Sequence, residues 1–319
     1  MIASVIEMED WCFSWEDWMD NSLAWATRYG HEGVVRMLLG QDDIQPDELD
    51  ENGRTPLSRA ASNGSEEVVR MLLRRNDVNP NKPDSDGKTP LWWAARYGND
   101  GVVKLLLERD GINPDKPDSH SRIPLLWAAC FGNEEVVKIL LGQDDIDPNG
   151  QGEGGQTPLF LAARNGHSGV VEMLLGRDDI NPNKSNMNGV TPLLVAAKKG
   201  HEGVVRMLLE RDDIDSSRAK SDGRTPLSWA ASSGHEGVVK ILLGRSDVDP
   251  DRPDRDGHTP LLWAASQCSQ PSGGPAGPRG GTAKSPGRDG TASCSPSRPP
   301  SGKDGRLWVG RRALQGETC

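Results

Sequence analysis

Residues 87–107 read GKTPLWWAARYGNDGVVKLLL, and the same pattern returns along most of the chain. Its threonine recurs every 34 residues, replaced by asparagine at the first step and by isoleucine at the fourth: Asn21, Thr55, Thr89, Ile123, Thr157, Thr191, Thr225 and Thr259. A fixed period of this length indicates a solenoid, in which short supersecondary units stack on one another. The sequence therefore predicts one elongated domain, in which each unit contacts only its neighbours.

Each unit is predicted to contain two short helices followed by a long loop. Thr89 has the hydroxyl of a helix N-cap, and Pro90 occupies the first helical position, where a missing backbone N–H costs nothing. Gly98 is expected to end the first helix in the left-handed conformation. An apolar second helix follows, and the Asp, Asn, Gly and Pro residues of 110–118 favour turns.

The motifs T-P-L, A-A-x-x-G and V-V-x-x-L-L, repeated in register, resemble the ankyrin repeat. The resemblance covers residues 21–266, with seven full repeats and a truncated eighth, and the loop wording is similar to that of fungal ankyrin-repeat proteins. It implies an all-α ankyrin-repeat solenoid, with paired short helices and long hairpin-like loops. The tetratricopeptide repeat shares the period, but it needs two long helices and the proline-broken loop leaves no room for them.

Several positions depart from the family pattern. The histidine that usually follows T-P-L is absent throughout, and apolar packing is expected to replace its hydrogen bonds at several steps. Histidine instead follows the glycine of the first helix, where Ser65, Asn99 and Asn133 also occur, so we predict a turn-stabilising or capping role. In the fourth repeat Ile123 cannot cap a helix, and Ser121 replaces a turn glycine. The glycine-rich loop 149–155 is predicted to be loose.

The two ends of the chain differ from the array. In residues 1–20, Trp11, Trp15 and Trp18 share one helical face and predict an acidic, aromatic cap on the first repeat. In residues 267–319, Gly, Pro and Ser account for 25 of 53 residues, which predicts a disordered tail. Residues 1–266 carry 29 Lys/Arg against 44 Asp/Glu, whereas the tail carries 8 against 3. The acidic body argues against broad binding of a phosphate backbone.

The sequence predicts neither an enzyme nor a cofactor or metal site. No nucleophile elbow, phosphate loop, zinc motif or dinucleotide fingerprint occurs. Asp251, Asp254 and Asp256 lack the spacing of a calcium loop, so a solvated turn is expected there. Five scattered cysteines, no signal peptide and no apolar run of membrane length predict free thiols and a cytoplasmic location, with the nucleus as the alternative.

The resemblance implies a non-catalytic scaffold that binds a partner protein in the concave groove lined by the first helices. The two residues before the glycine that ends each first helix would lie on this groove, and basic residues also precede the threonine at several steps. The predicted partner-binding residues are Tyr29, Arg96, Tyr97, Phe131, Arg164, Lys198 and Lys199. A recurring tryptophan two residues after the T-P-L leucine is expected to pack between repeats, with exposed recognition of a partner as the alternative.

Two other functions stay open at this point. The basic tail and the basic groove positions would suit nucleic acid, and the chain could be a regulatory module of a larger multidomain protein. The truncated eighth repeat would leave apolar residues without a covering helix, which predicts self-association through that end.

Overall fold

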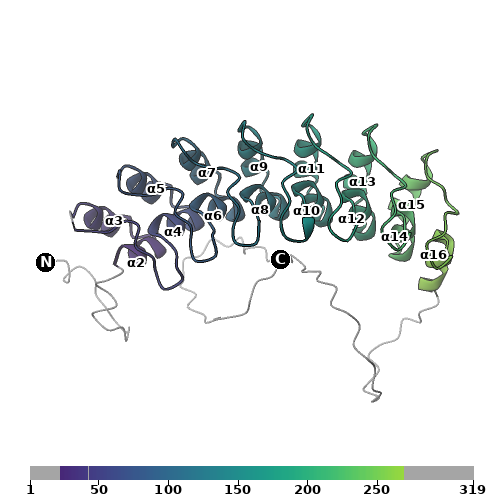
Figure 1. The fold of residues 1–319 in the computed structure, drawn as a ribbon, viewed down its shortest axis with the longest axis horizontal. Helices are drawn as coiled ribbons and strands as arrows, with labels where there is room; N and C mark the ends of the chain where they lie inside the picture. Colours follow the sequence, from purple (N-terminus) through teal and green to yellow (C-terminus); the bar gives the residue numbers. More distant parts are fainter. Residues whose placement is uncertain (1–21, 42, 269–319) are drawn as a thin grey trace, which may run out of the picture.

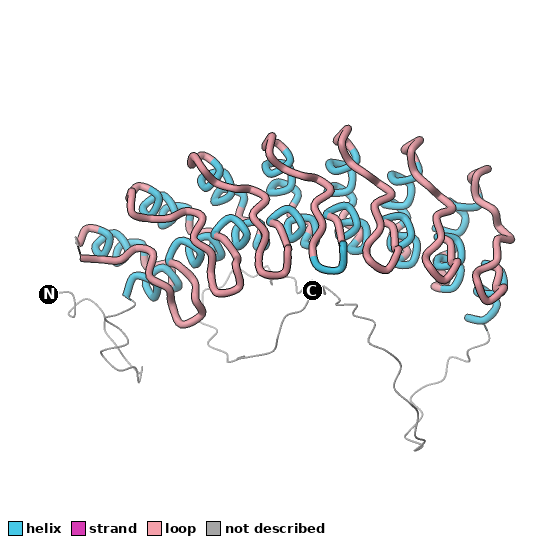
Figure 2. The backbone as a smooth tube through the Cα atoms, in the orientation of Figure 1, coloured by secondary structure: helices cyan, strands magenta, loops and turns pink. Residues whose placement is uncertain are grey.

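The computed structural model describes residues 22–41 and 43–268, which form a curved double row of antiparallel helix pairs (Figure 1). The inner row, on the concave side of the curve, comprises α2 Ser22–Arg28, α4 Pro56–Asn63, α6 Pro90–Tyr97, α8 Pro124–Phe131, α10 Pro158–Asn165, α12 Pro192–Lys199, α14 Pro226–Ser232 and α16 Pro260–Cys268. The outer row comprises α3 Glu32–Leu39, α5 Glu66–Leu73, α7 Asp100–Leu107, α9 Glu134–Leu141, α11 Ser168–Leu175, α13 Glu202–Leu209 and α15 Glu236–Leu243. Long loops join the pairs, and their hairpin tips follow the concave edge (Figure 2).

The ends of the inner helices are set by local chemistry, as predicted. The Thr89 hydroxyl accepts a hydrogen bond from the backbone N–H of Trp92, and Pro90 opens the helix. Gly98 ends it with φ of 73°, in the left-handed region where a side chain would be strained. Ile123 gives α8 no side-chain cap, and Ser121 adopts a positive φ of 60° in the place of a turn glycine.

The core is a continuous layer between the two rows, because inner helices pack on inner helices and outer on outer. Each T-P-L leucine from Leu57 to Leu227 is at most 2% exposed. Apolar packing does replace the absent histidine at several steps, since Trp92, Leu126, Phe160 and Leu194 are all buried. The predicted packing role of the recurring tryptophan holds for Trp93 and Trp127, whereas Trp25 is exposed.

One set of polar bonds between repeats comes from the residue after the first-helix glycine. Asn133 donates to the carbonyl oxygens of Ala95 and Arg96, and His167 Nε2 lies 2.9 Å from the carbonyl oxygen of Cys130. His201 and His235 make the same bond to the preceding repeat. These residues make no side-chain bond at the start of their own helix. Their role is to satisfy the carbonyls that end the neighbouring first helix.

A second set of hydrogen bonds joins each outer loop to the next and forms a ladder along the array. The side chain that makes these bonds recurs every 34 residues, beginning with Asp47. Asn149 Oδ1 accepts from the backbone N–H of Asn181 at 2.7 Å, and its Nδ2 donates to the carbonyl of Asp179 at 2.7 Å. Asn183 repeats both bonds one step later. This ladder connects each outer loop to the next one.

Asp47 and Asp115 occupy two positions of this ladder, but an aspartate lacks the side-chain amide group with which asparagine donates to the next loop. Asp115 Oδ2 accepts from the backbone N–H of Asp147 at 2.7 Å, while its Oδ1 is buried without a partner. Burial raises the pKa of the Asp115 carboxyl above its ordinary value, and the charges of Asp147 and Asp145 add to the rise. Burial likewise raises the pKa of Asp47. Ionised aspartate is therefore an unfavourable residue at these steps.

We expect Asp115→Asn to increase the free energy of unfolding by on the order of 1 kcal/mol near neutral pH, since an amide supplies the missing donor. The folded-state pKa is raised, so the penalty on the wild type is absent below the unfolded pKa and grows as pH rises through the folded one. The gain should thus be smallest near pH 3 (roughly a unit below the ordinary value) in urea unfolding. The reverse change, Asn149→Asp, should destabilise the array. A less stable Asp115→Asn variant would contradict this account.

The glycine-rich loop is packed rather than loose, contrary to the sequence prediction. Residues Glu153–Gly155 form a 3-10 turn (η1), and the carbonyl of Gly154 accepts from the backbone N–H of Met187 in the next loop. Gly152 is buried, and a Cβ atom there would lie 2.7 Å from Leu126 Cδ1. These glycines allow close approach between repeats, a use that glycine serves as readily as flexibility.

The predicted cap, 1–20, lies outside the described residues, and the predicted tail, 267–319, does so from residue 269 onward. The last helix, α16, continues to Cys268, two residues past the predicted limit of the array.

Candidate functional site

The predicted partner-binding residues lie at the C-terminal ends of the inner helices, along the concave side. Tyr29 and Tyr97 are 51% and 52% exposed. Lys198 and Lys199 are also exposed, while Arg96, Phe131 and Arg164 are half-buried. Each position results from the same local event, because the glycine that follows ends the helix and leaves the last two side chains off the core face.

Arg96 is the centre of this surface. Its guanidinium carbon lies 4.7 Å from the ring centroid of Trp127, 5.6 Å from Phe131 and 5.7 Å from both Trp92 and Tyr97. Trp127 and Phe131 belong to the next repeat, so the contact joins α6 to α8. Cation–π contacts of this kind are favourable and hold the guanidinium in place.

Stacked aromatic pairs flank Arg96 on both sides. The rings of Trp93 and Tyr97 stack with centroids 6.0 Å apart, and those of Trp127 and Phe131 at 5.6 Å. The buried indole of Trp92 lies edge-on to both tryptophans. The cluster of Trp92, Trp93, Arg96, Tyr97, Trp127 and Phe131 is called the central cluster below.

Basic residues before the threonines lie over the same recurring tryptophans. Arg54 lies 3.6 Å from the centroid of Trp93, and Arg122 lies 5.2 Å from that of Trp127. Near the other end Arg224 lies 3.4 Å from Trp263. Burial lowers the pKa of Arg54, followed by the charge of Arg59, but a guanidinium stays protonated in proteins. Arginines therefore cover tryptophan rings along the concave side, and two of them, Arg122 and Arg224, are also paired with Asp118 and Asp254.

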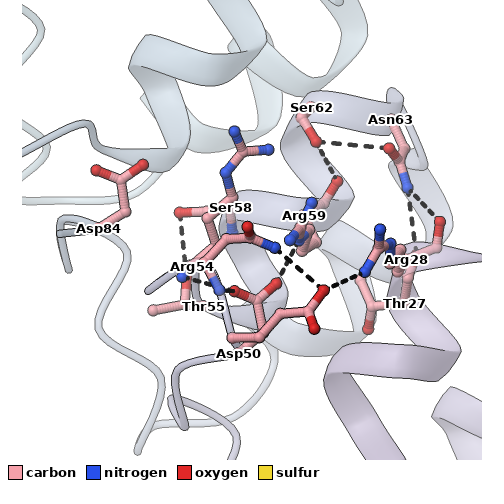
Figure 3. A network of polar contacts seen from close by, with 12 residues as sticks. Thr27, Arg28, Asp50, Arg54, Thr55, Ser58, Arg59, Ser62, Asn63 and Asp84 are labelled. Carbon is pink, nitrogen blue, oxygen red and sulfur yellow. Dashed lines mark hydrogen bonds and ion pairs between the residues drawn. The ribbon is translucent and has the colours of Figure 1, made fainter. Parts of the chain in front are cut away.

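A hairpin aspartate holds these groups in position. Asp84 Oδ1 accepts from the backbone N–H groups of Asp86 and Lys88, and Oδ2 accepts from Trp93 Nε1 at 3.0 Å. Asp254 does the same for Trp263. The position of these tryptophans, two residues after the T-P-L leucine, is called the slot below. In the second repeat the slot holds Arg59, and Asp50 accepts from Arg59 Nε instead (Figure 3). These bonds therefore connect the hairpin to the inner helix of each such repeat.

The structure brings only part of the predicted set together. Arg96, Tyr97 and Phe131 belong to the central cluster, and Arg164 lines a hollow beside Trp127. Tyr29 lies apart, next to Trp25 and His31 of the first repeat. The Lys198 ammonium lies 4.2 Å from the ring centroid of Trp229, and Lys199 is its exposed neighbour. They form a second, smaller basic area toward the C-terminal end.

Sequence reasoning missed the hollow between α8, α10 and the hairpin at 152–156. It has a cavity volume of about 30 Å³, and its lining includes the apolar Leu126, Trp127 and Leu161 together with Arg122 and Arg164. Two substitutions in the repeat pattern could have indicated it. Gly152 replaces the hairpin aspartate, and Leu161 replaces the tryptophan or arginine of the preceding steps.

Asp254, Asp256 and His258 have ligand atoms within 4.8 Å of one another, the one such group among the described residues. Both Asp254 oxygens already accept hydrogen bonds, from the backbone of Asp256 and His258 and from Trp263. The geometry is that of an aspartate-stabilised turn. Within the described part of the chain, no helix has the length and apolar character needed to cross a bilayer.

Comparison with known proteins agrees with the repeat pattern. A family model of ankyrin repeats, in three copies, matches residues 16–84, 76–152, 125–218, 159–254 and 213–272. Among solved structures, the human ASB11 ankyrin repeat domain is similar, with a TM-score of 0.59 and 26% sequence identity, covering 70% of this chain and 100% of that domain. The comparison with curated proteins gives no match.

Proposed function

Because the chain belongs to the ankyrin-repeat family, whose repeats are protein–protein interaction modules, we propose that it is a non-catalytic scaffold that binds a partner protein on its concave side. The central cluster is the proposed centre of the interface. The observation that carries this proposal is the placement of Arg96 among four aromatic rings in two repeats. Arginine, tyrosine and tryptophan are the residue types enriched at the energetic centres of interfaces.

The charge of the surface favours a partner segment with acidic and apolar groups. Arg54, Arg96, Arg122 and Arg224 lie over aromatic rings, so their guanidinium groups are preorganised. A preorganised arginine loses little rotamer freedom when it meets a carboxylate. Exposed Tyr97 adds apolar area with few rotatable bonds.

Nucleic acid is the second candidate, because arginine and aromatic residues also bind single strands. Base stacking needs free ring faces, whereas arginines cover the faces of Trp93, Trp127 and Trp263 here. The two functions differ in salt dependence, since release of counterions from nucleic acid gives a steep slope. A steep fall in affinity with salt, together with binding of oligothymidylate, would favour this candidate.

We expect Arg96→Ala, Tyr97→Ala and Phe131→Ala each to weaken partner binding by about 2 kcal/mol, the scale of interface anchors. The partner is first identified by crosslinking and mass spectrometry, and calorimetry then gives the affinity of each variant. Arg206→Ala is the matched control, because Arg206 is an exposed arginine on α13 of the outer row. Circular dichroism confirms the fold of each variant. Unchanged affinity in all three would reject the central cluster as the interface.

We further propose that copies of this chain associate through α16. Leu261 and Leu262 are 74% and 52% exposed, whereas the equivalent residues of the fourth repeat, Leu125 and Leu126, are at most 3% exposed. No second helix follows α16 within the described residues to cover them. An exposed apolar patch of this kind favours association.

Replacing Leu261 and Leu262 together by glutamate should shift the chain toward monomer in analytical ultracentrifugation, because burying two charged side chains in an interface costs free energy of desolvation. Met187→Glu is the control, since Met187 is 81% exposed but lies away from α16. A wild-type chain that sediments as a monomer across the whole concentration range would refute the association.

A further inference from the structure

The hollow beside the central cluster exists because two bulky groups are missing from one repeat. At the steps before it the slot residue is Arg59, Trp93 or Trp127, and the hairpin aspartates Asp50 and Asp84 bond to the first two. In the fifth repeat both are replaced, by Leu161 and Gly152. Gly152 also lets the hairpin approach Leu126 more closely than a Cβ atom would permit. The surface is therefore open at this step and filled at the steps before it.

The walls and rim of the hollow differ in chemistry. Leu126, Trp127 and Leu161 make apolar walls, and most of the lining is apolar. Arg122 and Arg164 lie at the rim, with Glu153 as the one acidic residue of the lining. Asp118, which is 6% exposed, accepts from Arg122 Nε at 2.9 Å, so the Arg122 guanidinium is fixed in orientation. Arg96 lies over the Trp127 ring and adds a positive charge close by, while Asp118 offsets part of the charge of Arg122.

We infer that this hollow is the anchor pocket of the concave surface and takes the tip of one small apolar side chain of a partner peptide, with an aspartate or glutamate next to it. This inference rests on the proposed function and specifies its ligand. The apolar side chain would replace water against Leu126 and Leu161, and the carboxylate would lie between Arg122 and Arg164. Arginine binds carboxylates through two parallel N–H bonds, which makes the pair specific as well as favourable.

An acidic peptide fits this pocket better than a nucleotide. Trp127 is 4% exposed, so its ring offers edge contact to an apolar side chain but no free face for a base. A nucleic-acid strand lying along the array would also be repelled by its net negative charge, because residues 1–266 carry 29 basic against 44 acidic residues. A single carboxylate meets the local positive charge without that wider repulsion.

The test uses a library of random 12-residue peptides displayed on phage and the full chain as bait. The wild type should enrich peptides in which an apolar residue adjoins Asp or Glu. Leu161→Trp, which introduces the tryptophan that the third and fourth repeats have at this position, should fill the hollow and reduce affinity for a synthetic copy of the selected peptide about tenfold or more. Leu161→Met conserves volume and is the control, with affinity within about twofold of the wild type. Arg164→Glu should weaken acidic peptides and leave their Gln-substituted versions nearly unchanged, and it keeps the test valid if Leu161→Trp fails to fold.

The outcomes separate this inference from the proposed function. Peptides that bind Leu161→Trp as tightly as the wild type, but lose affinity on Arg96→Ala, would overturn the pocket and leave the concave surface intact. Selected peptides without acidic residues would overturn the assigned chemistry. No enrichment at all, or stronger binding of a 12-residue oligothymidylate than of any peptide, would overturn both.

Discussion

Replacing Trp92 by alanine is expected to lower the free energy of unfolding by about 3–5 kcal/mol, the range for a buried aromatic residue cut to a methyl group. Trp92 is fully buried and stands where the family usually has histidine. Its ring contacts Trp93 at 4.9 Å and Trp127 at 5.1 Å between centroids, so the cavity would open between two repeats. Stability of a solenoid depends on such neighbour contacts, and urea unfolding followed by circular dichroism would measure the loss.

Trp92→Phe is the control that separates the effect of ring packing from the effect of the indole N–H. The indole Nε1 of Trp92 is buried without a partner, so phenylalanine loses volume but no hydrogen bond. We therefore expect a clearly smaller loss than for alanine. Equal losses in the two variants would show that the indole nitrogen, rather than the packed ring, stabilises this position.

Asp84→Ala is expected to cost about 3 kcal/mol or more, because one buried carboxylate satisfies three donors. Its oxygens accept from the backbone of Asp86 and Lys88 at 3.0 and 2.9 Å and from Trp93 Nε1 at 3.0 Å. Hydrogen bonds to an ionised acceptor are stronger than neutral ones. Without them the hairpin at 84–88 would separate from α6, and thermal unfolding would report the change.

Asp84→Asn should retain much of this stability. Asn186 already stands at the equivalent step and accepts from the backbone N–H groups of Asn188 and Val190. Only the bond to Trp93 would then be lost, because the asparagine Nδ2 is a donor and cannot accept from Trp93 Nε1. If the asparagine substitution proved as harmful as the alanine substitution, the charge of Asp84 among the surrounding cations would be the important term instead.

The helices and their order could be predicted because their limits depend on neighbours in sequence. A threonine hydroxyl reaches an N–H three residues on, and a glycine adopts positive φ by itself, so Thr89 and Gly98 define α6 without help from the fold. The 34-residue period predicted that successive repeats stack on one another. The concave placement of Tyr97 was implied by the resemblance to ankyrin repeats.

The missed features depend on contacts between repeats. Arg96 lies over Phe131, 35 residues further along the chain, and no local pattern states which rings would surround it. The glycines at 152–155 were interpreted as flexible because composition alone does not show what packs against them. The histidines were expected near their own turn, but His167 bonds to a carbonyl 37 residues earlier. Residues separated by this many positions in the sequence come into contact only when the repeats have stacked.

The most direct test of concave binding is photocrosslinking of the full chain to its partner, with benzoylphenylalanine in place of Tyr97 or, in a second variant, of Glu172. Tyr97 is half exposed beside the central cluster, and Glu172 is exposed on α11 of the outer row. We predict crosslinks from position 97 and none from position 172. Crosslinks from position 172 alone would place the partner on the convex side and contradict the account.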